Sequence, residues 1–142
     1  MTPRTKTDMI VIHCASTPAS MDIGVKEIKK WHVEDNKWDD IGYHYVIRRD
    51  GTLENGREEH RTGSHARQVN GTSIGVALVG GGTPSMGWEN NFAPIQFETL
   101  KSILLKLKNE YEIEKIIGHY EVDDKKECPS FDVPKWLEKN NI

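Results

Sequence analysis

The sequence predicts an α/β fold in which one β-sheet carries helices on its faces, and three observations support this class. Short apolar segments typical of strands alternate along the chain with segments of helical periodicity. The 142 residues fit one compact domain, 1–142. Hydrophobic residues make up 36% and charged residues 29% of the chain, which suffices for a buried core without disulfide staples.

The first strand and the first helix are predicted near the N-terminus. Asp8–Ala15 is expected to be a buried strand, because its centre is a run of four apolar residues that are mostly β-branched. Residues 16–23 follow as a loop. Gly24–Lys37 is expected to be an amphipathic helix, because its apolar residues recur at helical spacing with charged residues between them: Val25, Ile28 and Trp31.

A hairpin and another strand are predicted in the middle of the chain. Tyr43–Arg49 has strand-like alternation, and Asp50-Gly51 directly after it is a strong hairpin signal. Thr52–Glu54 would then be the returning strand. Ser73–Val79 is an apolar strand that ends at three consecutive glycines, where the chain must turn.

Two helices and one strand are expected in the C-terminal third. Pro94 suits the first turn of a helix that runs to Glu112. Its buried stripe consists of apolar residues at helical spacing: Leu100, Ile103, Leu104, Leu107 and Tyr111. Lys115–Gly118 is a short strand, and Asp132 is expected to cap a final short helix.

Charge and the N-terminal residues narrow the class of partner. The formal net charge is -3, whereas a general binder of polyanions is usually basic, so nucleic acid is not expected as the main substrate. Met1–Asp8 is polar and no apolar run approaches the length of a membrane span. We therefore expect a chain that is made in the cytoplasm and does not insert into a membrane.

Three residues far apart in the sequence carry the most informative chemistry. His13 ends the first apolar run, His119 follows the last predicted strand, and Cys128 comes nine residues later. Open α/β sheets bind ligands at the carboxyl ends of their strands, so the two histidines are expected to lie together. Two imidazoles and one thiolate suit a zinc ion with one open coordination position, which is typical of hydrolytic zinc. Each histidine alone would more often be an ordinary polar residue, so the hypothesis depends on the set.

Cys14 is the alternative ligand, and a Cys14–Cys128 disulfide is the structural alternative. Neighbouring residues of a strand point to opposite faces. If His13 faces the cleft, we therefore expect Cys14 to face the core as a small apolar residue. Two cysteines are weak evidence for a disulfide when no export signal is visible.

Three further residues are candidates whose ordinary interpretation is structural. Tyr43 could be a core aromatic, and Lys126 could be a solvated loop lysine beside Lys125. Only proximity to a metal would give either a chemical role. His65 lies in an irregular segment between strands, and such segments often line clefts. We expect it either to contact the substrate or to be structural.

Taken together, these residues resemble the zinc-dependent N-acetylmuramoyl-L-alanine amidases, and within that family the chain looks most like the phage lysozymes. Peptidoglycan recognition proteins are more distant relatives. The matching motifs run in order over nearly the whole chain: Ile12-His13-Cys14, Gly24-Val25-Lys26-Glu27-Ile28, Trp31-His32, Gly42-Tyr43-His44-Tyr45, Arg49-Asp50-Gly51-Thr52, Gly63-Ser64-His65-Ala66, the strand 73–81, His119-Tyr120-Glu121-Val122 and Cys128-Pro129-Ser130-Phe131-Asp132.

The resemblance implies a central mixed β-sheet flanked by helices, with one zinc ion in a surface groove. It implies His13, His119 and Cys128 as zinc ligands, and Tyr43 and Lys126 as catalytic residues. The implied reaction is hydrolysis of the amide bond between N-acetylmuramic acid and L-alanine in bacterial peptidoglycan. Tyr43 could orient water, bind the intermediate or move a proton to the leaving amine.

The implied biology is that of a phage endolysin, which waits in the host cytoplasm and reaches the cell wall after the membrane is permeabilised. The groove must accept a polar peptide, so Arg57 and Arg67 are expected to contact its carboxylates. We expect a monomer. A protein that binds peptidoglycan without cleaving it is the alternative on this scaffold, but relatives of that kind lack the ligand cysteine.

The chain departs from the phage-lysozyme pattern in two places. The loop from His119 to Cys128 is one residue longer, so Lys125 could take the place of Lys126. The segment before His13 is shorter. A phage RNA polymerase is a second expected partner, because a similar lysozyme inhibits one partly through its N-terminal region.

Overall fold

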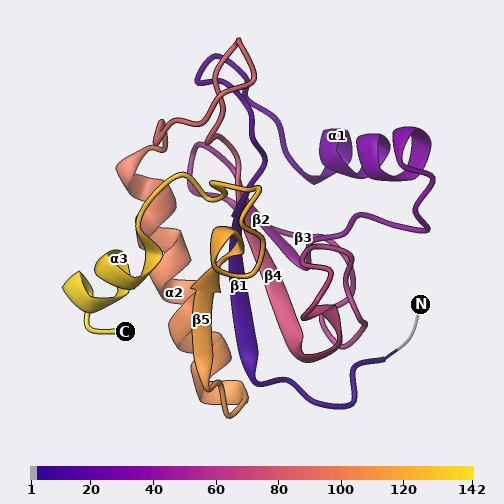
Figure 1. Cartoon of the computed structure of the whole chain (residues 1–142), viewed down its shortest axis with the longest axis vertical. Helices are drawn as coiled ribbons and strands as arrows, with labels where there is room; N and C mark the ends of the chain where they lie inside the picture. Colours follow the sequence, from indigo (N-terminus) through magenta and orange to yellow (C-terminus); the bar gives the residue numbers. More distant parts are fainter. Residues whose placement is uncertain (1–2) are drawn as a thin grey trace.

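Five strands form one mixed β-sheet in the order β3-β2-β4-β1-β5, in a computed structural model that describes residues 3–142 (Figure 1). Met1 and Thr2 of the polar N-terminal segment lie outside the described residues. All neighbouring strands are parallel except β2 and β3, which form the antiparallel hairpin predicted from Asp50-Gly51. The strands are β1 (Met9–Cys14), β2 (Tyr45–Ile47), β3 (Leu53–Asn55), β4 (Ser73–Leu78) and β5 (Lys115–Gly118).

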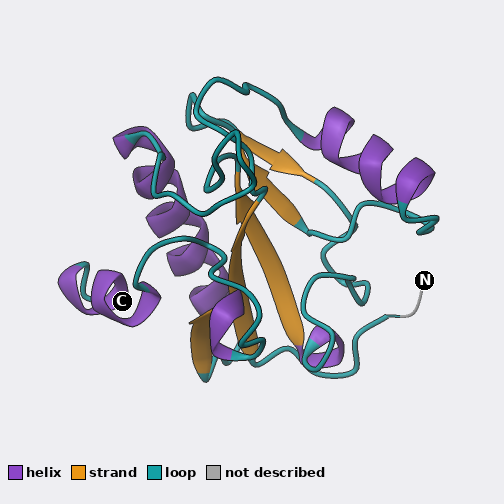
Figure 2. Ribbon diagram, turned by 45° about the horizontal axis from the view of Figure 1, so that its top comes forward, coloured by secondary structure: helices purple, strands orange, loops and turns teal. Residues whose placement is uncertain are grey.

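Helices cover both faces of this sheet, so the predicted α/β class is confirmed. Figures 1 and 2 show α1 (Val25–Lys30) and α2 (Pro94–Glu110) on opposite sides of the strands. The third helix, α3 (Val133–Lys139), is capped by Asp132 as predicted, because the Asp132 carboxylate accepts a hydrogen bond from the backbone N–H of Lys135 at 3.1 Å.

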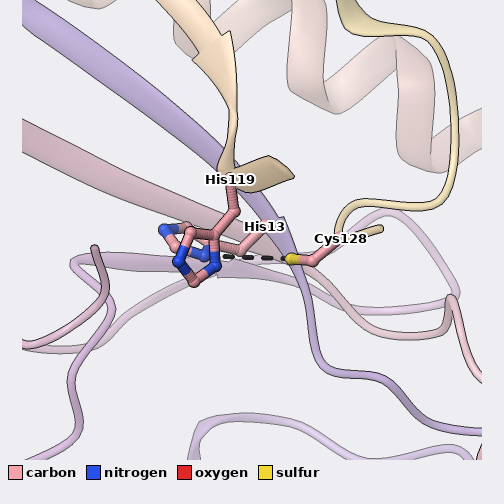
Figure 3. Close-up of side chains that lie close together, drawn as sticks. All are labelled: His13, His119 and Cys128. Atoms are coloured by element: carbon pink, nitrogen blue, oxygen red, sulfur yellow. Dashed lines mark hydrogen bonds between the residues drawn. The ribbon is translucent and has the colours of Figure 1, made fainter. Parts of the chain in front are cut away.

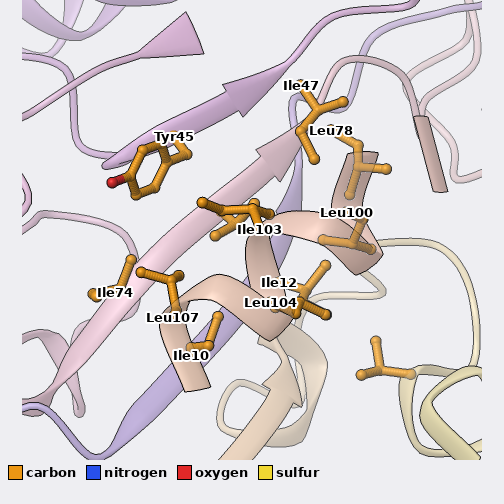
Figure 4. Close-up of a cluster of buried hydrophobic side chains, with 12 residues drawn as sticks. Ile10, Ile12, Tyr45, Ile47, Ile74, Leu78, Leu100, Ile103, Leu104 and Leu107 are labelled. Atoms are coloured by element: carbon orange, nitrogen blue, oxygen red, sulfur yellow. The ribbon is translucent and has the colours of Figure 1, made fainter. Parts of the chain in front are cut away.

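The main hydrophobic core lies between the sheet and α2 (Figure 4). Most of the apolar stripe predicted for this helix is buried, and it packs on alternate residues of the strands such as Ile10, Ile12 and Ile74. The helix ends at Glu110 instead of Glu112, so Tyr111 lies just beyond it and is only partly buried. Four members of the stripe are at most 2% exposed: Leu100, Ile103, Leu104 and Leu107. The opposite face of the sheet, on the side of α1, carries several small or polar residues, some of which pack against His65: His13, His44, Ser73 and Gly75.

Some predicted bounds differ from the observed ones. The helix predicted over Gly24–Lys37 is α-helical only to Lys30 and continues as a π-helical turn, Trp31–Asp35, because the N–H of Asn36 donates to the carbonyl five residues back. The strand predicted over Tyr43–Arg49 shortens to β2, because the turn already begins at Arg48, whose carbonyl accepts from the N–H of Gly51 at 2.9 Å.

Two 3₁₀ turns were not predicted: Asn70–Thr72 and His119–Glu121. The second directly follows β5 and turns the chain over the end of the sheet. Among residues 3–142, no helix is both long enough and apolar enough to cross a lipid bilayer.

Candidate active site

The sheet register brings two of the predicted metal ligands together. Ile12 of β1 pairs with Gly118 of β5, so the next residues, His13 and His119, lie at the same edge of two parallel strands. Their ring centroids are 4.6 Å apart. His13 is buried, whereas His119 is half-buried. The two histidines therefore lie at the carboxyl ends of parallel strands, which is where open α/β sheets bind their ligands.

The loop after β5 brings Cys128 to the same place. Its carbonyl accepts from the N–H of Tyr120 at 3.0 Å, which closes the loop on itself. The Cys128 sulfur lies 3.9 Å from Nδ1 of His13 and accepts the backbone N–H of Cys14 at 3.0 Å (Figure 3). One donor atom from each of His13, His119 and Cys128 lies within 4.8 Å of the other two. This three-donor cluster could hold a metal ion.

Burial sets the protonation of the cluster. It lowers the pKa of both His13 and His119, so both imidazoles are neutral at pH 7, as metal ligands must be. Asp123 opposes this shift at His119, where its carboxylate lies 4.0 Å from Nε2. Burial and the neighbouring Cys14 raise the pKa of the Cys128 thiol, while the Cys14 N–H and the Lys126 ammonium oppose that shift.

Tyr43 and Lys126, for which the resemblance implied catalytic roles, both line the cavity in front of the cluster. The Tyr43 ring lies 5.1 Å from the His13 ring, and burial raises the pKa of its hydroxyl, so the phenol is protonated at neutral pH. Lys125 does not line this cavity. The cavity holds about 180 Å³ and is lined by His13, Cys14, Ser16, His32, Trp38, Tyr43, Ser64, His65, Trp88, His119, Lys126 and Cys128.

A second cavity of about 430 Å³ adjoins the first and shares Trp88 and Lys126 with it. Aromatic and acidic side chains line it, which are groups that bind polar organic molecules by stacking and hydrogen bonding. They include Glu89, Tyr120, Glu127, Phe131 and Asp132. Together the two cavities form a groove that extends well beyond the three-donor cluster.

Two of the predicted substrate contacts do not lie in this groove. The Arg57 side chain is buried, and its guanidinium donates to the carbonyls of Ile41 at 2.9 Å and Thr62 at 2.8 Å. Its donors thus hold loops together, and the structure corrects the predicted contact with a peptide carboxylate. Arg67 is exposed on the surface and lines neither cavity.

His65 lines the cavity but is almost fully buried, at 8% exposure. Its Nδ1 lies 2.8 Å from Nε2 of His13, and its Nε2 lies 3.3 Å from the hydroxyl of Ser73. Both ring nitrogens are therefore engaged within the protein, which leaves none for a substrate.

Cys14 largely follows expectation. It is outside the three-donor cluster, as predicted, and both cysteines are free thiols. It is 2% exposed and pairs in the sheet register with Leu78, a member of the main core, so the alternation of faces holds through the last residue of β1. The residue also borders the cavity, where its sulfur lies 3.9 Å from the Ser130 hydroxyl.

Two residues of the site were missed by sequence reasoning. Asp123 faces His119 four positions further along the chain, a spacing that places side chains together once this segment turns helically. Trp88 comes from a loop without periodic pattern, and no signal in the sequence marks it.

Comparison with known proteins identifies the family. A sequence model described as N-acetylmuramoyl-L-alanine amidase matches residues 3–131. The chain belongs to this family. It is therefore an amidase, and the resemblance inferred from its motifs is confirmed.

Curated relatives cover almost the whole amidase. The endolysin of Klebsiella phage KP32 is 47% identical over 99% of this chain and 92% of its own length. The endolysin of Escherichia phage T7 is also 47% identical, over 98% of this chain and 91% of its own.

Solved structures share the fold. An N-acetylmuramoyl-L-alanine amidase, LysC from Clostridium intestinale, has a TM-score of 0.81 at 31% identity, over 96% of this chain and 87% of its own. Drosophila PGRP-LB has a TM-score of 0.74 at 25% identity, over 92% of this chain and 82% of its own.

Proposed function

We propose that the amidase is a zinc-dependent phage endolysin that hydrolyses the bond between N-acetylmuramic acid and L-alanine in peptidoglycan. The observation that carries the proposal is the three-donor cluster of His13, His119 and Cys128 at the floor of the groove. Relatives that are 47% identical over nearly the whole chain and are named endolysins support the biological role.

The donor set fits zinc. Zinc bonds of about 2.3 Å to sulfur and 2.0–2.1 Å to nitrogen at a tetrahedral angle separate the two atoms by about 3.6 Å. The Cys128 sulfur and Nδ1 of His13 are 3.9 Å apart, close to that value. Three protein donors leave a fourth position open, as catalytic zinc sites do. Bound zinc would supply Lewis acidity, which polarises a carbonyl oxygen and acidifies water at neutral pH.

The chain's own residues supply the remaining chemistry. The Tyr43 phenol keeps its proton at neutral pH, so it acts as a hydrogen-bond donor to the amide group of the substrate instead of a base. The Lys126 ammonium at the rim of the groove compensates the negative charge that develops on the carbonyl oxygen. The adjoining aromatic cavity is large enough to hold part of the substrate beyond the scissile bond.

The test is metal content measured together with the release of L-alanine N-termini from purified peptidoglycan. We expect Cys128→Ser to lose zinc and activity together. Cys14→Ser is the matched control, because it removes the neighbouring buried thiol that is outside the three-donor cluster, and it should retain zinc. Full activity of the wild type after exhaustive chelation would refute the proposal.

The proposed route to the substrate is release from the cytoplasm after the membrane has been permeabilised. Added from outside, the protein should clear chloroform-treated Gram-negative cells and leave intact ones turbid. Inhibition of a phage RNA polymerase stays a prediction. A transcription assay with Cys128→Ser tests it, because inhibition that survives loss of the metal requires a separate binding surface.

A further inference from the structure

His65 is held rigidly beneath the metal site. Its ring packs closely against two glycines: a Cβ on Gly75 would lie 2.6 Å from its Cγ, and one on Gly63 would lie 2.7 Å from its Cδ2. Both distances are too short for any larger residue at either position. The Asn70 side chain accepts the backbone N–H of His65 at 2.9 Å and that of Ala66 at 2.8 Å, which fixes the loop.

A chain of hydrogen bonds runs from His13 through this ring to the backbone. Nε2 of His13 lies 2.8 Å from Nδ1 of His65, Nε2 of His65 lies 3.3 Å from the Ser73 hydroxyl, and that hydroxyl donates to the carbonyl of Val69 at 2.7 Å. In this series of hydrogen bonds, only the Val69 carbonyl has a fixed role, because a carbonyl oxygen can accept but not donate.

Because the Val69 carbonyl can only accept, it determines which nitrogen carries the proton in His65 and in His13. Since the Ser73 hydroxyl donates to Val69, it accepts from His65, so a neutral His65 carries its proton on Nε2. Nδ1 of His65 is then an acceptor, and His13 must donate from Nε2. That leaves the lone pair of His13 on Nδ1, the atom that faces the Cys128 sulfur at 3.9 Å.

We propose that His65 is a positioning residue of the metal site, which fixes the tautomer and the orientation of His13 so that Nδ1 faces the ion. This inference rests on the proposed zinc dependence. It also replaces the predicted role of His65 as a substrate contact, because neither ring nitrogen is free. Partners of this kind typically change metal affinity about 10–100-fold when they are removed.

The reverse direction is inconsistent with metal binding. If His65 donated from Nδ1, Nε2 of a neutral His13 would accept, and the His13 proton would sit on Nδ1. His13 would then offer no lone pair toward Cys128. Without His65, the Nε2–H of His13, a residue that is 1% exposed, would be buried without its partner.

Two variants at one position separate hydrogen bonding from packing. His65→Leu removes the acceptor, and we expect it to weaken zinc binding about 10–100-fold in competition with a chromophoric chelator. His65→Asn places an amide oxygen near the site of Nδ1, and its zinc affinity should stay within a few-fold of wild type. Unfolding midpoints of the metal-free variants report whether each chain still folds.

A second measurement reads the tautomers directly. In two-bond ¹H–¹⁵N spectra of the zinc-loaded wild type, both His13 and His65 should carry their protons on Nε2. A folded His65→Leu that binds zinc like wild type, a folded His65→Asn as weak as His65→Leu, or a proton on Nδ1 of His65 would each overturn the inference. Failure of the wild type itself to bind zinc would instead overturn the proposed function.

Discussion

The strongest pH prediction concerns His44, a histidine that is 1% exposed on the face of the sheet toward α1. Its Nδ1 accepts the N–H of Gly75 at 3.0 Å, and its Nε2 lies 2.7 Å from the carbonyl of Arg61. Because Nδ1 accepts a hydrogen bond, the neutral ring carries its proton on Nε2, which also lies 3.1 Å from Nη1 of Arg4. Burial lowers the pKa of His44 from 6.5 to about 4, and the contact with the Arg61 carbonyl opposes that shift only in part.

The sign of the effect follows from which state binds the proton. The unfolded chain takes up a proton on His44 near pH 6.5, whereas the folded chain resists it down to about pH 4. Folding stability from this residue is therefore unchanged above pH 6.5 and falls as the pH drops between these values. The full difference of roughly 2.5 pH units corresponds to about 3.5 kcal/mol at about 1.4 kcal/mol per unit.

His44→Asn isolates this contribution. The amide oxygen of asparagine can accept the Gly75 N–H, but the side chain does not titrate. We expect the difference in unfolding free energy between wild type and variant, from urea titrations at constant ionic strength, to change by about 2 kcal/mol between pH 7 and pH 4.5. The wild type should lose more stability than the variant. Parallel curves over this range would refute the reasoning.

Three further predictions follow from packing, capping and the groove. Lys126→Ala should reduce kcat about 10²–10³-fold with zinc retained, whereas Lys125→Ala, the adjacent control, should leave steady-state kinetics on peptidoglycan unchanged. Leu104→Ala should lower the free energy of unfolding by about 2–5 kcal/mol in urea, because this core side chain is fully buried; a loss below 1 kcal/mol would contradict the packing. Asp132→Ala should cost about 1 kcal/mol through loss of the α3 cap, and Asp132→Asn, which can still cap, should restore most of it.

The part of the site that follows from periodic structure could be predicted from the sequence. His13 and His119 each come at the end of an apolar strand, and parallel strands bring their carboxyl ends to one edge. The apolar stripe of α2 was equally predictable. Apolar residues three and four positions apart lie on one face of a helix, and that face must pack against the sheet to be buried.

The contacts made by loops could not be predicted in this way. An arginine is normally expected on the surface, but the guanidinium of Arg57 donates to the carbonyls of Ile41 and Thr62. These carbonyls belong to two different loops, and no sequence pattern predicts that the loops lie together. The position of the His65 ring depends on the space that Gly75 of β4 leaves by having no side chain. The sequence shows the glycine, but it does not show which residue packs against it. The burial of Cys14 could be predicted from strand alternation, but its place at the edge of the cavity could not, because the loop that carries Ser130 forms that edge.

The spacing of the donors along the chain has a consequence for durability. His13 and Cys128 stand 115 positions apart, so an ion held by both would act as a cross-link that closes most of the polypeptide into one ring. An ion that binds only the native state also adds to its stability by mass action. Proteases released during lysis should therefore digest the loaded enzyme more slowly than the empty one, and a polypeptide truncated before Cys128 would lose this protection together with its chemistry.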